Sequence, residues 1–280
     1  MKLSIITVNL NNRDGLQKTI DSVVSQTFKD FEWIVIDGGS TDGSKELIEQ
    51  YADHFAYWVS EPDKGIYNAM NKGIKVAKGD YLQFLNSGDW LCDEKALERF
   101  FSHGFTADVA YGNLYLSGED GLEELCYSDI LSLKFFLKQT LCHNATFIKR
   151  VLLLENLYDE NLKIVSDWKF FLIQLLNNKD FQYINEFVIV YDMSGISSVN
   201  GELAVREMTD IVAVTIPKAM LQDFKRMDEM EELLSKDHVR KVLEFGRKKK
   251  IYHKMITGCL EFISYVDKVF CSRTRKTSGR

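Results

Sequence analysis

The first third of this sequence alternates short apolar runs, rich in β-branched and aromatic residues, with longer segments of helical periodicity. Such alternation is typical of βαβ units and predicts a mainly parallel sheet. We expect strands at residues 3–8, 31–37, 56–60 and 81–86, with helices at 15–26, 41–51 and 66–77. Because open parallel sheets bind ligands beyond the carboxyl ends of their strands, the residues after each strand are the most informative ones.

Small, polar and acidic residues follow all of these strands. They form the segments TVNLNN (7–12), DGGSTDG (37–43), SEPDKG (60–65) and NSGD (86–89). Carboxylates on a glycine-rich loop can accept hydrogen bonds from ribose hydroxyls, and the glycines let a planar base approach the backbone. We interpret Asp37, fixed at a strand end, as a binding residue rather than a strand terminator. For Ser40 and Asp42, helix capping and ligand binding explain the sequence equally well.

Several classes of protein do not fit the composition. The glycines follow the second strand, and neither G-x-G-x-x-G after the first strand nor G-K-[ST] occurs, which excludes a dinucleotide fingerprint and a P-loop. The net charge of −6 divides into +9 over residues 236–280 and −15 over the rest, and an acidic body argues against nucleic acid as a partner. Five cysteines without C-x-x-C indicate neither a disulfide framework nor a zinc site, and suit a reducing cytoplasm. No stretch approaches the roughly 18 apolar residues of a spanning helix, so we expect a soluble or peripheral protein.

Beyond residue 100 the alternation weakens. We expect strands at 109–116, 145–149 and 187–191, a turn at 118–121, helices at 129–138 and 167–176, and a wholly helical pattern from 202 onward. The sequence thus predicts an α/β catalytic domain over 1–200, with a nucleotide-binding half at 1–117 and an acceptor and base half at 118–200. A helical, basic extension would occupy 201–280. Residues 247–270 combine a basic run with an apolar helical face, which fits peripheral membrane contact and a packing helix equally well.

The strand-end motifs carry a family resemblance. In chain order they read SIITVNLN (4–11), WIVIDGGSTDGS (33–44), GIYNAMNKGI (65–74) and GDYLQFLNSGD (79–89). This set is similar to the large family 2 of inverting glycosyltransferases, which have the GT-A fold, a Rossmann-like fold for nucleotide-diphospho-sugar transferases with a mostly parallel sheet. Weaker similarity continues to about residue 198.

The resemblance implies a site for a nucleoside diphosphate sugar. Thr7 and Asp37 would contact the base and ribose, with Asp63 or Lys64 lining the same pocket. The other donor-binding positions that it implies are Asn9, Asn68, Lys72, Asn86, Ser87, Gly88 and His143. His143 fits a purely structural role equally well.

Asp89 matches the last acidic position of the family's Asp-X-Asp signature, which binds Mn²⁺ or Mg²⁺ between the two phosphates. A divalent cation offsets the negative charge that builds on a departing diphosphate. This chain departs from the common pattern because Asn86 and Gly88 stand where many relatives carry carboxylates. A single carboxylate with phosphate oxygens and waters can still hold Mg²⁺. At Met70 many members carry a nucleotide-binding arginine, for which Lys72 or Tyr67 would substitute.

The family's catalytic base is an acidic residue at the start of a later helix, and Asp167 in IVSDW (164–168) resembles it. Helix N-termini favour the ionised form of a carboxylate, which a general base requires. Helix capping is the rival interpretation of Asp167. Residues 195–198 resemble the family's loop near the donor phosphates, and Trp168 fits a core residue better than a sugar platform.

The sequence therefore predicts an inverting, metal-dependent glycosyltransferase that moves a sugar, UDP-linked by expectation, to a hydroxyl of a glycan or lipid-linked acceptor. Surface polysaccharide synthesis at the inner face of the cytoplasmic membrane is the setting that the resemblance implies. Two alternatives stay open. One is a nucleotidyltransferase of related fold, although residues 9–12 lack its usual basic, glycine-rich character. The other is a nucleotide-sugar-binding protein with weakened catalysis.

Overall fold

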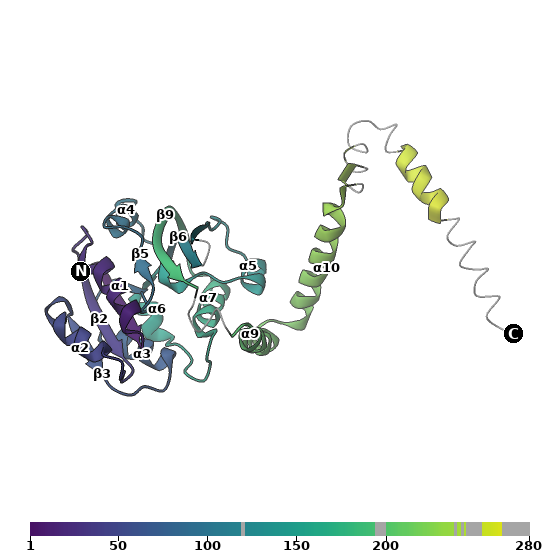
Figure 1. Ribbon diagram of the computed structural model, residues 1–280. Coiled ribbons are helices and arrows are strands. Elements are labelled where there is room, and N and C mark those ends of the chain that lie inside the picture. Colours follow the sequence, from purple (N-terminus) through teal and green to yellow (C-terminus); the bar gives the residue numbers. More distant parts are fainter. Residues whose placement is uncertain (119–120, 194–199, 238–239, 242–243, 245–253, 265–280) are drawn as a thin grey trace. The chain divides into compact units, whose positions relative to one another are not determined.

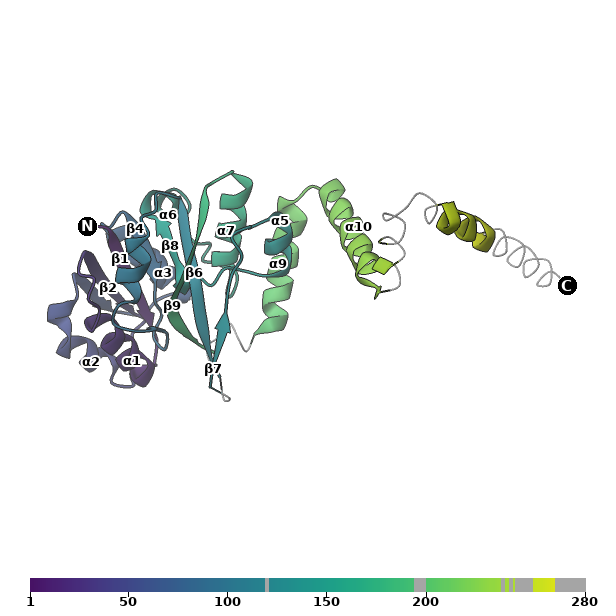
Figure 2. The same cartoon turned by 90° about the horizontal axis from the view of Figure 1, so that it is seen from above.

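The computed structural model describes residues 1–118, 121–193, 200–237, 240–241, 244 and 254–264. It divides into two compact units, Met1–Val214 and Thr215–Arg280. The first unit contains one mixed sheet with the strand order β3-β2-β1-β4-β8-β6-β9-β5, and β7 pairs with β6 (Figures 1 and 2).

The first half of the sheet is parallel. Its strands are β1 (Leu3–Asn9), β2 (Phe31–Asp37), β3 (Tyr57–Ser60) and β4 (Tyr81–Phe84). β1 pairs with β2 on one side and β4 on the other, so that Asn9 lies opposite Asp37 and Ile6 opposite Phe84. These four strands match the expected ranges to within two residues at each end, and their carboxyl ends share one edge, as predicted.

The second half departs from the parallel pattern. β5 (Trp90–Leu91), β6 (Val109–Gly118), β7 (Gly121–Leu125), β8 (Thr146–Lys149) and β9 (Phe181–Asp192) form it. β8 runs antiparallel to β4 and β6, β5 runs antiparallel to β9, and β6 pairs in parallel with β9. The mainly parallel sheet therefore holds only for the first half. β8 pairs with β4 and β6 across long intervening segments, so these antiparallel pairs join parts of the chain that are distant in the sequence.

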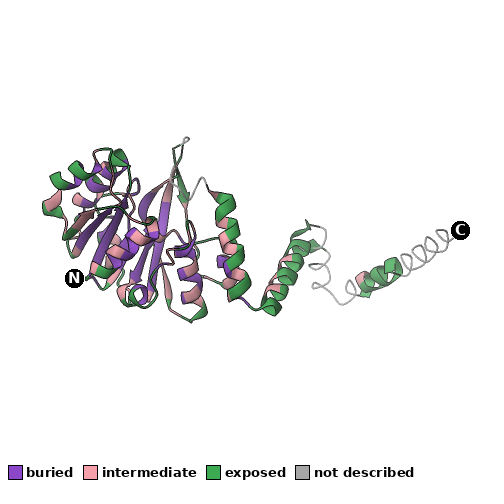
Figure 3. Ribbon diagram, turned by 90° about the horizontal axis from the view of Figure 1, so that it is seen from below, coloured by how far each residue is buried: buried purple, intermediate pink, exposed green. Residues whose placement is uncertain are grey.

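Helices cover this sheet. In unit one they are α1 (Arg13–Val24), α2 (Ser44–Gln50), α3 (Ile66–Val76), α4 (Ala96–Ser102), α5 (Leu133–Lys138), α6 (Arg150–Glu155), α7 (Ser166–Leu176) and α9 (Gly201–Thr215). Single 3₁₀ turns lie at Ala52–His54 and His143–Ala145. Figure 3 shows the buried residues gathered on the strands and on the inner faces of the helices. α1 illustrates the pattern, since Leu16, Ile20 and Val23 are fully buried.

Most of α9, which the sequence pattern assigned to the extension after residue 200, packs within the first compact unit. The first unit extends to Val214. Two features of α9 explain this: Ile211 is buried at 7% exposure, and Glu207 accepts hydrogen bonds from the backbone before α7. The second unit contains α10 (Lys218–Ser235) and a helical stretch at 254–264. In the part of the chain that the structure describes, every helix is too short or too polar to cross a bilayer.

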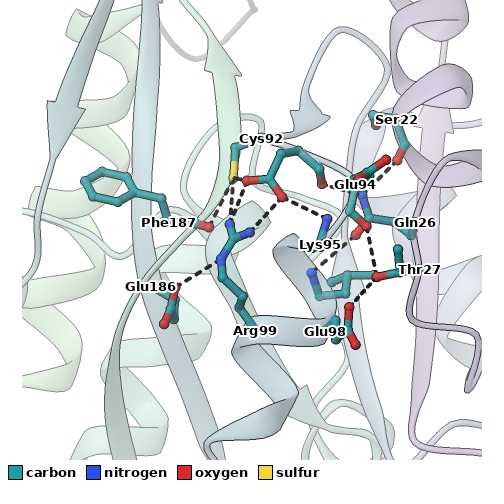
Figure 4. A network of polar contacts seen from close by, with 12 residues as sticks. Ser22, Gln26, Thr27, Cys92, Glu94, Lys95, Glu98, Arg99, Glu186 and Phe187 are labelled. Atoms are coloured by element: carbon teal, nitrogen blue, oxygen red, sulfur yellow. Dashed lines mark hydrogen bonds and ion pairs between the residues drawn. The ribbon is translucent and has the colours of Figure 1, made fainter.

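A polar network fastens α4 to the second half of the sheet (Figure 4). Arg99 donates to both carboxylate oxygens of Asp93, at 2.8 and 2.7 Å, and to Glu186 of β9 at 3.3 Å. Thr27, after α1, donates to Glu98 of α4 at 2.7 Å. These contacts hold the segment that follows the NSGD loop against β9.

The tight approach of two chain segments gives a first prediction. A β-carbon on Gly79 would lie 2.5 Å from the backbone nitrogen of Ser4, a contact that no side-chain rotation relieves. We expect Gly79→Ala to lower the free energy of unfolding by about 1–3 kcal/mol, the usual cost of overpacking. Urea denaturation measures it. Gly201→Ala is the control, because a β-carbon there meets nothing within 4 Å, and equal stability of both variants would contradict the packing.

Candidate active site

Asp37 is the centre of the first cluster at the sheet edge. Its buried carboxylate accepts hydrogen bonds from Asn9 Nδ2 at 2.7 Å, Ser40 Oγ at 2.5 Å and Ser60 Oγ at 2.6 Å. Asn9 and the Ser40 hydroxyl bind Oδ1, whereas the Ser60 hydroxyl and the amides of Gly39 and Ser40 bind Oδ2. Burial alone raises the pKa of Asp37, but the hydrogen bonds from Ser40, Ser60 and Asn9 outweigh it, so the pKa lies below its ordinary value. The carboxylate is therefore ionised and rigidly held.

The loop after β1 joins this cluster to the NSGD segment. Asn12 caps α1 by accepting from the Gly15 amide, and its Nδ2 donates to the Ser87 carbonyl at 3.0 Å. Asn11, in the left-handed region at φ 50°, accepts from the Thr41 amide at 2.9 Å. One loop thus contacts the loops that carry Asp37 and Asp89, and the two carboxylates lie on the same edge of the sheet.

Of the predicted residues around α3, Asp63 lies beside the Asp37 loop, and the others face elsewhere. Asp63 packs over Gly38, where an added β-carbon would come within 2.5 Å of its Oδ2. Lys64 is exposed. Lys72 pairs with Glu61 at 2.7 Å, and Asn68 donates to Glu160 at 2.8 Å.

Thr7, Met70 and Tyr67 lie away from the surface of this edge. Thr7 is fully buried, and its Oγ1 accepts from Trp33 Nε1 at 3.0 Å. Met70 is a core residue at 0% exposure. Tyr67 is occupied at α7, as described below. The position of Thr7 therefore gives no support to contact with a base.

Asp89 is the second buried carboxylate, at 5% exposure. It accepts from Asn144 Nδ2 at 2.5 Å and from the Asp192 amide at 2.8 Å. Burial raises the pKa of Asp89 to about 7, with the negative charge of Asp192 adding to it and the Asp192 amide, His143 and Asn144 opposing it. Gly88 precedes it at φ +104°, a conformation that favours glycine, and a β-carbon there would lie 3.5 Å from Asp192 Oδ2.

The oxygen atoms around Asp89 are compatible with the binding of a hard divalent cation. Asp89 and Asp192 bring two carboxylates together, and Asn86 Oδ1 is buried without a hydrogen-bond partner among the described residues. Mg²⁺ and Mn²⁺ take oxygen ligands of this kind and complete their shell with phosphates and water. Within residues 1–264 as described, no three His, Cys, Asp or Glu side chains cluster, so a cation here would depend on such additional ligands. The carboxylate of Asp192 lies near the position of Gly88, at which, as at Asn86, many relatives carry a carboxylate of their own.

Asp167 and His143 form the third element of the site. His143 Nδ1 lies 2.7 Å from Asp167 Oδ2, and Tyr67 Oη lies 2.9 Å from Asp167 Oδ1. On its other side His143 Nε2 is 3.1 Å from Asn86 Nδ2. An ionised carboxylate can only accept, so Nδ1 carries the proton, and Nε2 accepts from Asn86. His143 therefore bridges Asp167 and the NSGD loop.

Asp167 is ionised in spite of its burial. Burial raises its pKa, but the hydrogen bonds from His143, Tyr67 and the Trp168 amide lower the pKa below its ordinary value. Tyr67 stays protonated, because burial and the Asp167 charge raise its pKa far above the usual range. Each carboxylate oxygen keeps a further lone pair, so Asp167 can still take a proton from a hydroxyl. Trp168 is buried with its indole N–H on the Phe136 carbonyl at 2.7 Å, as a core residue would be.

The sequence interpretation missed several residues of this site. Asn144 stands next to His143, and Asp192 ends the last strand, so the strand-end rule applied to β9 would have found it. Tyr67 was considered only as a replacement for an arginine. Glu207 gave no signal, because a single glutamate on a polar helix looks like a solvated charge. Residues 195–198, predicted to line the donor phosphates, lie outside the described residues.

The comparisons with known proteins agree with this architecture. The family description "Glycosyl transferase family 2" matches residues 4–149, just over half of the 280 residues. An uncharacterized glycosyltransferase of Mycobacterium tuberculosis is 38% identical over 181 residues, covering 61% of this chain and 67% of that protein. A PGL/p-HBAD biosynthesis glycosyltransferase of Mycobacterium bovis is 30% identical over 181 residues, with 60% and 67% coverage.

Solved structures show the same fold. S. aureus TarS 1–349 superposes with a TM-score of 0.58 at 20% identity, over 69% of this chain and 60% of that one. The Pyrobaculum calidifontis mannosyltransferase PcManGT, solved with GDP-Man and Mn²⁺, gives 0.52 at 14% identity, over 68% of this chain and 56% of that one. The molecule is a GT-A-type α/β protein with the buried carboxylates of Asp37 and Asp89 at the sheet edge and the partly buried carboxylate of Asp167 in the first turn of α7. The chain belongs to glycosyl transferase family 2 and is a glycosyltransferase.

The His143 contact gives a pH prediction. Without His143, burial of Asp167 is less well opposed, so its pKa rises. A base works only when ionised, so the acid limb of kcat/KM should move to higher pH in His143→Ala. A pH–rate profile with an accepted donor measures this. His54→Ala, at an exposed histidine, should leave the limb in place, and an unmoved limb in His143→Ala would show that the pair does not set the ionisation of Asp167.

Proposed function

We propose that this protein transfers a sugar from a UDP-linked donor to a hydroxyl of a glycan or lipid-linked acceptor, with inversion at the anomeric carbon. The observation that carries the proposal is an ionised Asp167, held by His143 and Tyr67 and linked through Asn86 to the loop of Asp89. A TarS structure containing UDP-GlcNAc has the same fold, which supports a UDP-linked donor. The family resemblance supports a role in surface polysaccharide assembly.

Different side chains serve the sugar donor and the acceptor. Asp63 binds hydroxyl or N–H groups of the nucleoside. Asp37 is fully buried and already accepts several hydrogen bonds, so its part is to hold the loop at which the nucleoside binds. A divalent cation held by Asp89 and Asp192 would neutralise charge on the diphosphate. Asp167 takes the proton of the acceptor hydroxyl as its oxygen bonds to the anomeric carbon and the bond to the diphosphate oxygen breaks. One displacement inverts the configuration.

Catalysis by Asp167 is tested by Asp167→Asn. The amide keeps the shape but cannot accept a proton, so kcat should fall by about 10²–10⁴-fold, the usual contribution of a general base. UDP affinity, measured by calorimetry, should stay within twofold, because Asp167 acts on the acceptor. Asp53→Asn, at an exposed position, is the control. Undiminished turnover in Asp167→Asn would remove Asp167 as the base.

Donor binding is tested by Asp37→Asn and Asp89→Asn. Loss of a charged hydrogen bond or a cation ligand should weaken UDP binding by about 10- to 100-fold, and the Asp89 effect should require Mn²⁺. Calorimetry with UDP, with and without Mn²⁺, gives both values. Asp42→Asn is the matched control in the same loop, because the Asp42 carboxylate is engaged locally by the amide and hydroxyl of Ser44.

The two alternatives have their own outcomes in these assays. Binding of UDP and Mn²⁺ without transfer or hydrolysis of any nucleotide sugar would favour a binding protein. Formation of a nucleotide sugar from a nucleoside triphosphate and a sugar phosphate would identify a nucleotidyltransferase.

A further inference from the structure

Glu207 of α9 binds the backbone at the start of α7. Its carboxylate accepts from three successive amides, Lys163 at 2.8 Å, Ile164 at 3.0 Å and Val165 at 3.3 Å. Figures 1 and 2 show α9 beside α7. The first amides of a helix, and those that lead into it, lack intrahelical acceptors, so a side chain that accepts from them fixes the path of the chain there.

The next amide belongs to the same arrangement. Ser166 donates to Tyr67 Oη at 3.0 Å, and that hydroxyl also contacts the Ile164 carbonyl at 2.6 Å and Asp167 Oδ1 at 2.9 Å. Four consecutive amides before Asp167 are thus held by two side chains, Glu207 and Tyr67, from helices far apart in the sequence. The direction of the Asp167 carboxylate depends on this segment, since Asp167 is the second residue of α7.

The chemistry of Glu207 suits this task better than that of a neutral residue. A carboxylate offers two acceptor oxygens, one used by Lys163 and the other by Ile164 and Val165. A glutamine offers one acceptor and adds a donor that faces other donors. Glu207 has intermediate exposure, and Ile211 one turn later anchors α9 in the core.

We propose that Glu207 is a positioning residue for the reaction: by holding the amides of residues 163–165 it aims Asp167 at the acceptor hydroxyl. The inference rests on the proposed function, because it takes Asp167 as the base. Small displacements of a catalytic group cost rate rather than binding. A misplacement of about 1 Å can lower the rate about 10²-fold.

Three variants test the proposal: Glu207→Ala, Glu207→Gln and the control Asp210→Ala, an exposed acidic residue of the same helix. Amide hydrogen exchange tests the contact itself. In Glu207→Ala the amides of 163–165 should exchange at least about tenfold faster, since an acceptor with a charge has been lost. Turnover tests the consequence. We expect kcat to fall about tenfold or more in the alanine variant, with a smaller loss in the glutamine variant, while donor KM and UDP affinity stay within twofold.

The outcomes separate the two levels of the proposal. Faster exchange at 163–165 with wild-type kcat would overturn the positioning role and leave Asp167 as the base. Unchanged exchange would overturn the contact. Full activity in Asp167→Asn would overturn the proposed function whatever Glu207 does. If thermal melting shows that Glu207→Ala does not fold, Glu207→Gln decides the question, because it keeps one acceptor oxygen and nearly the same shape.

Discussion

The parallel pairing of β1 with both β2 and β4 is the constraint on which the site depends. Backbone hydrogen bonding fixes the register, so Asn9 must lie opposite Asp37, and the loop after β4 must emerge at the same edge. Side-chain contacts then tighten what the sheet has brought together, through Asn9 to Asp37 and through Asn12 to the Ser87 carbonyl. The place of the proposed donor site at this edge thus follows from the strand order.

The buried carboxylates show how local hydrogen bonding decides ionisation. Asp37 and Asp167 have lowered pKa values because several donors outweigh the cost of burial. Asp89 is buried too, yet its pKa is raised to about 7, since it has fewer donors and a neighbouring negative charge in Asp192. Asp37 and Asp167 are therefore ionised even when no ligand is bound. A nearby positive charge, such as a bound cation, would favour the ionised form of Asp89.

The sequence was most informative where strands are parallel and regular. The ranges of the first four strands, the edge on which Asp37 and Asp89 lie and a helix with Asp167 in its first turn were all predictable, because periodicity and strand-end composition are local signals. The antiparallel half and the short helices α4 and α6 were not. Their positions depend on contacts between distant segments. For example, β6 pairs with both β8 and β9.

The individual site residues also differ in how far the sequence could predict them. Asp37 and Asp167 could be singled out by position in a motif, whereas Tyr67, Asp192 and Glu207 act through partners about 40 to 100 residues away, such as Asp167 for Tyr67. No local pattern carries that information. Thr7 shows the opposite case: it occupies the right place in the motif, but the fold turns its hydroxyl toward Trp33.

The burial of Trp168 gives the protein a built-in optical probe. Its indole is bonded to the Phe136 carbonyl and follows Asp167 directly in the chain. Any rotation of the first turn of α7 would therefore alter the surroundings of this ring. Its fluorescence can report the alignment of the Asp167 carboxylate without labels, once the signals of the other three of the chain's four tryptophans have been assigned by substitution.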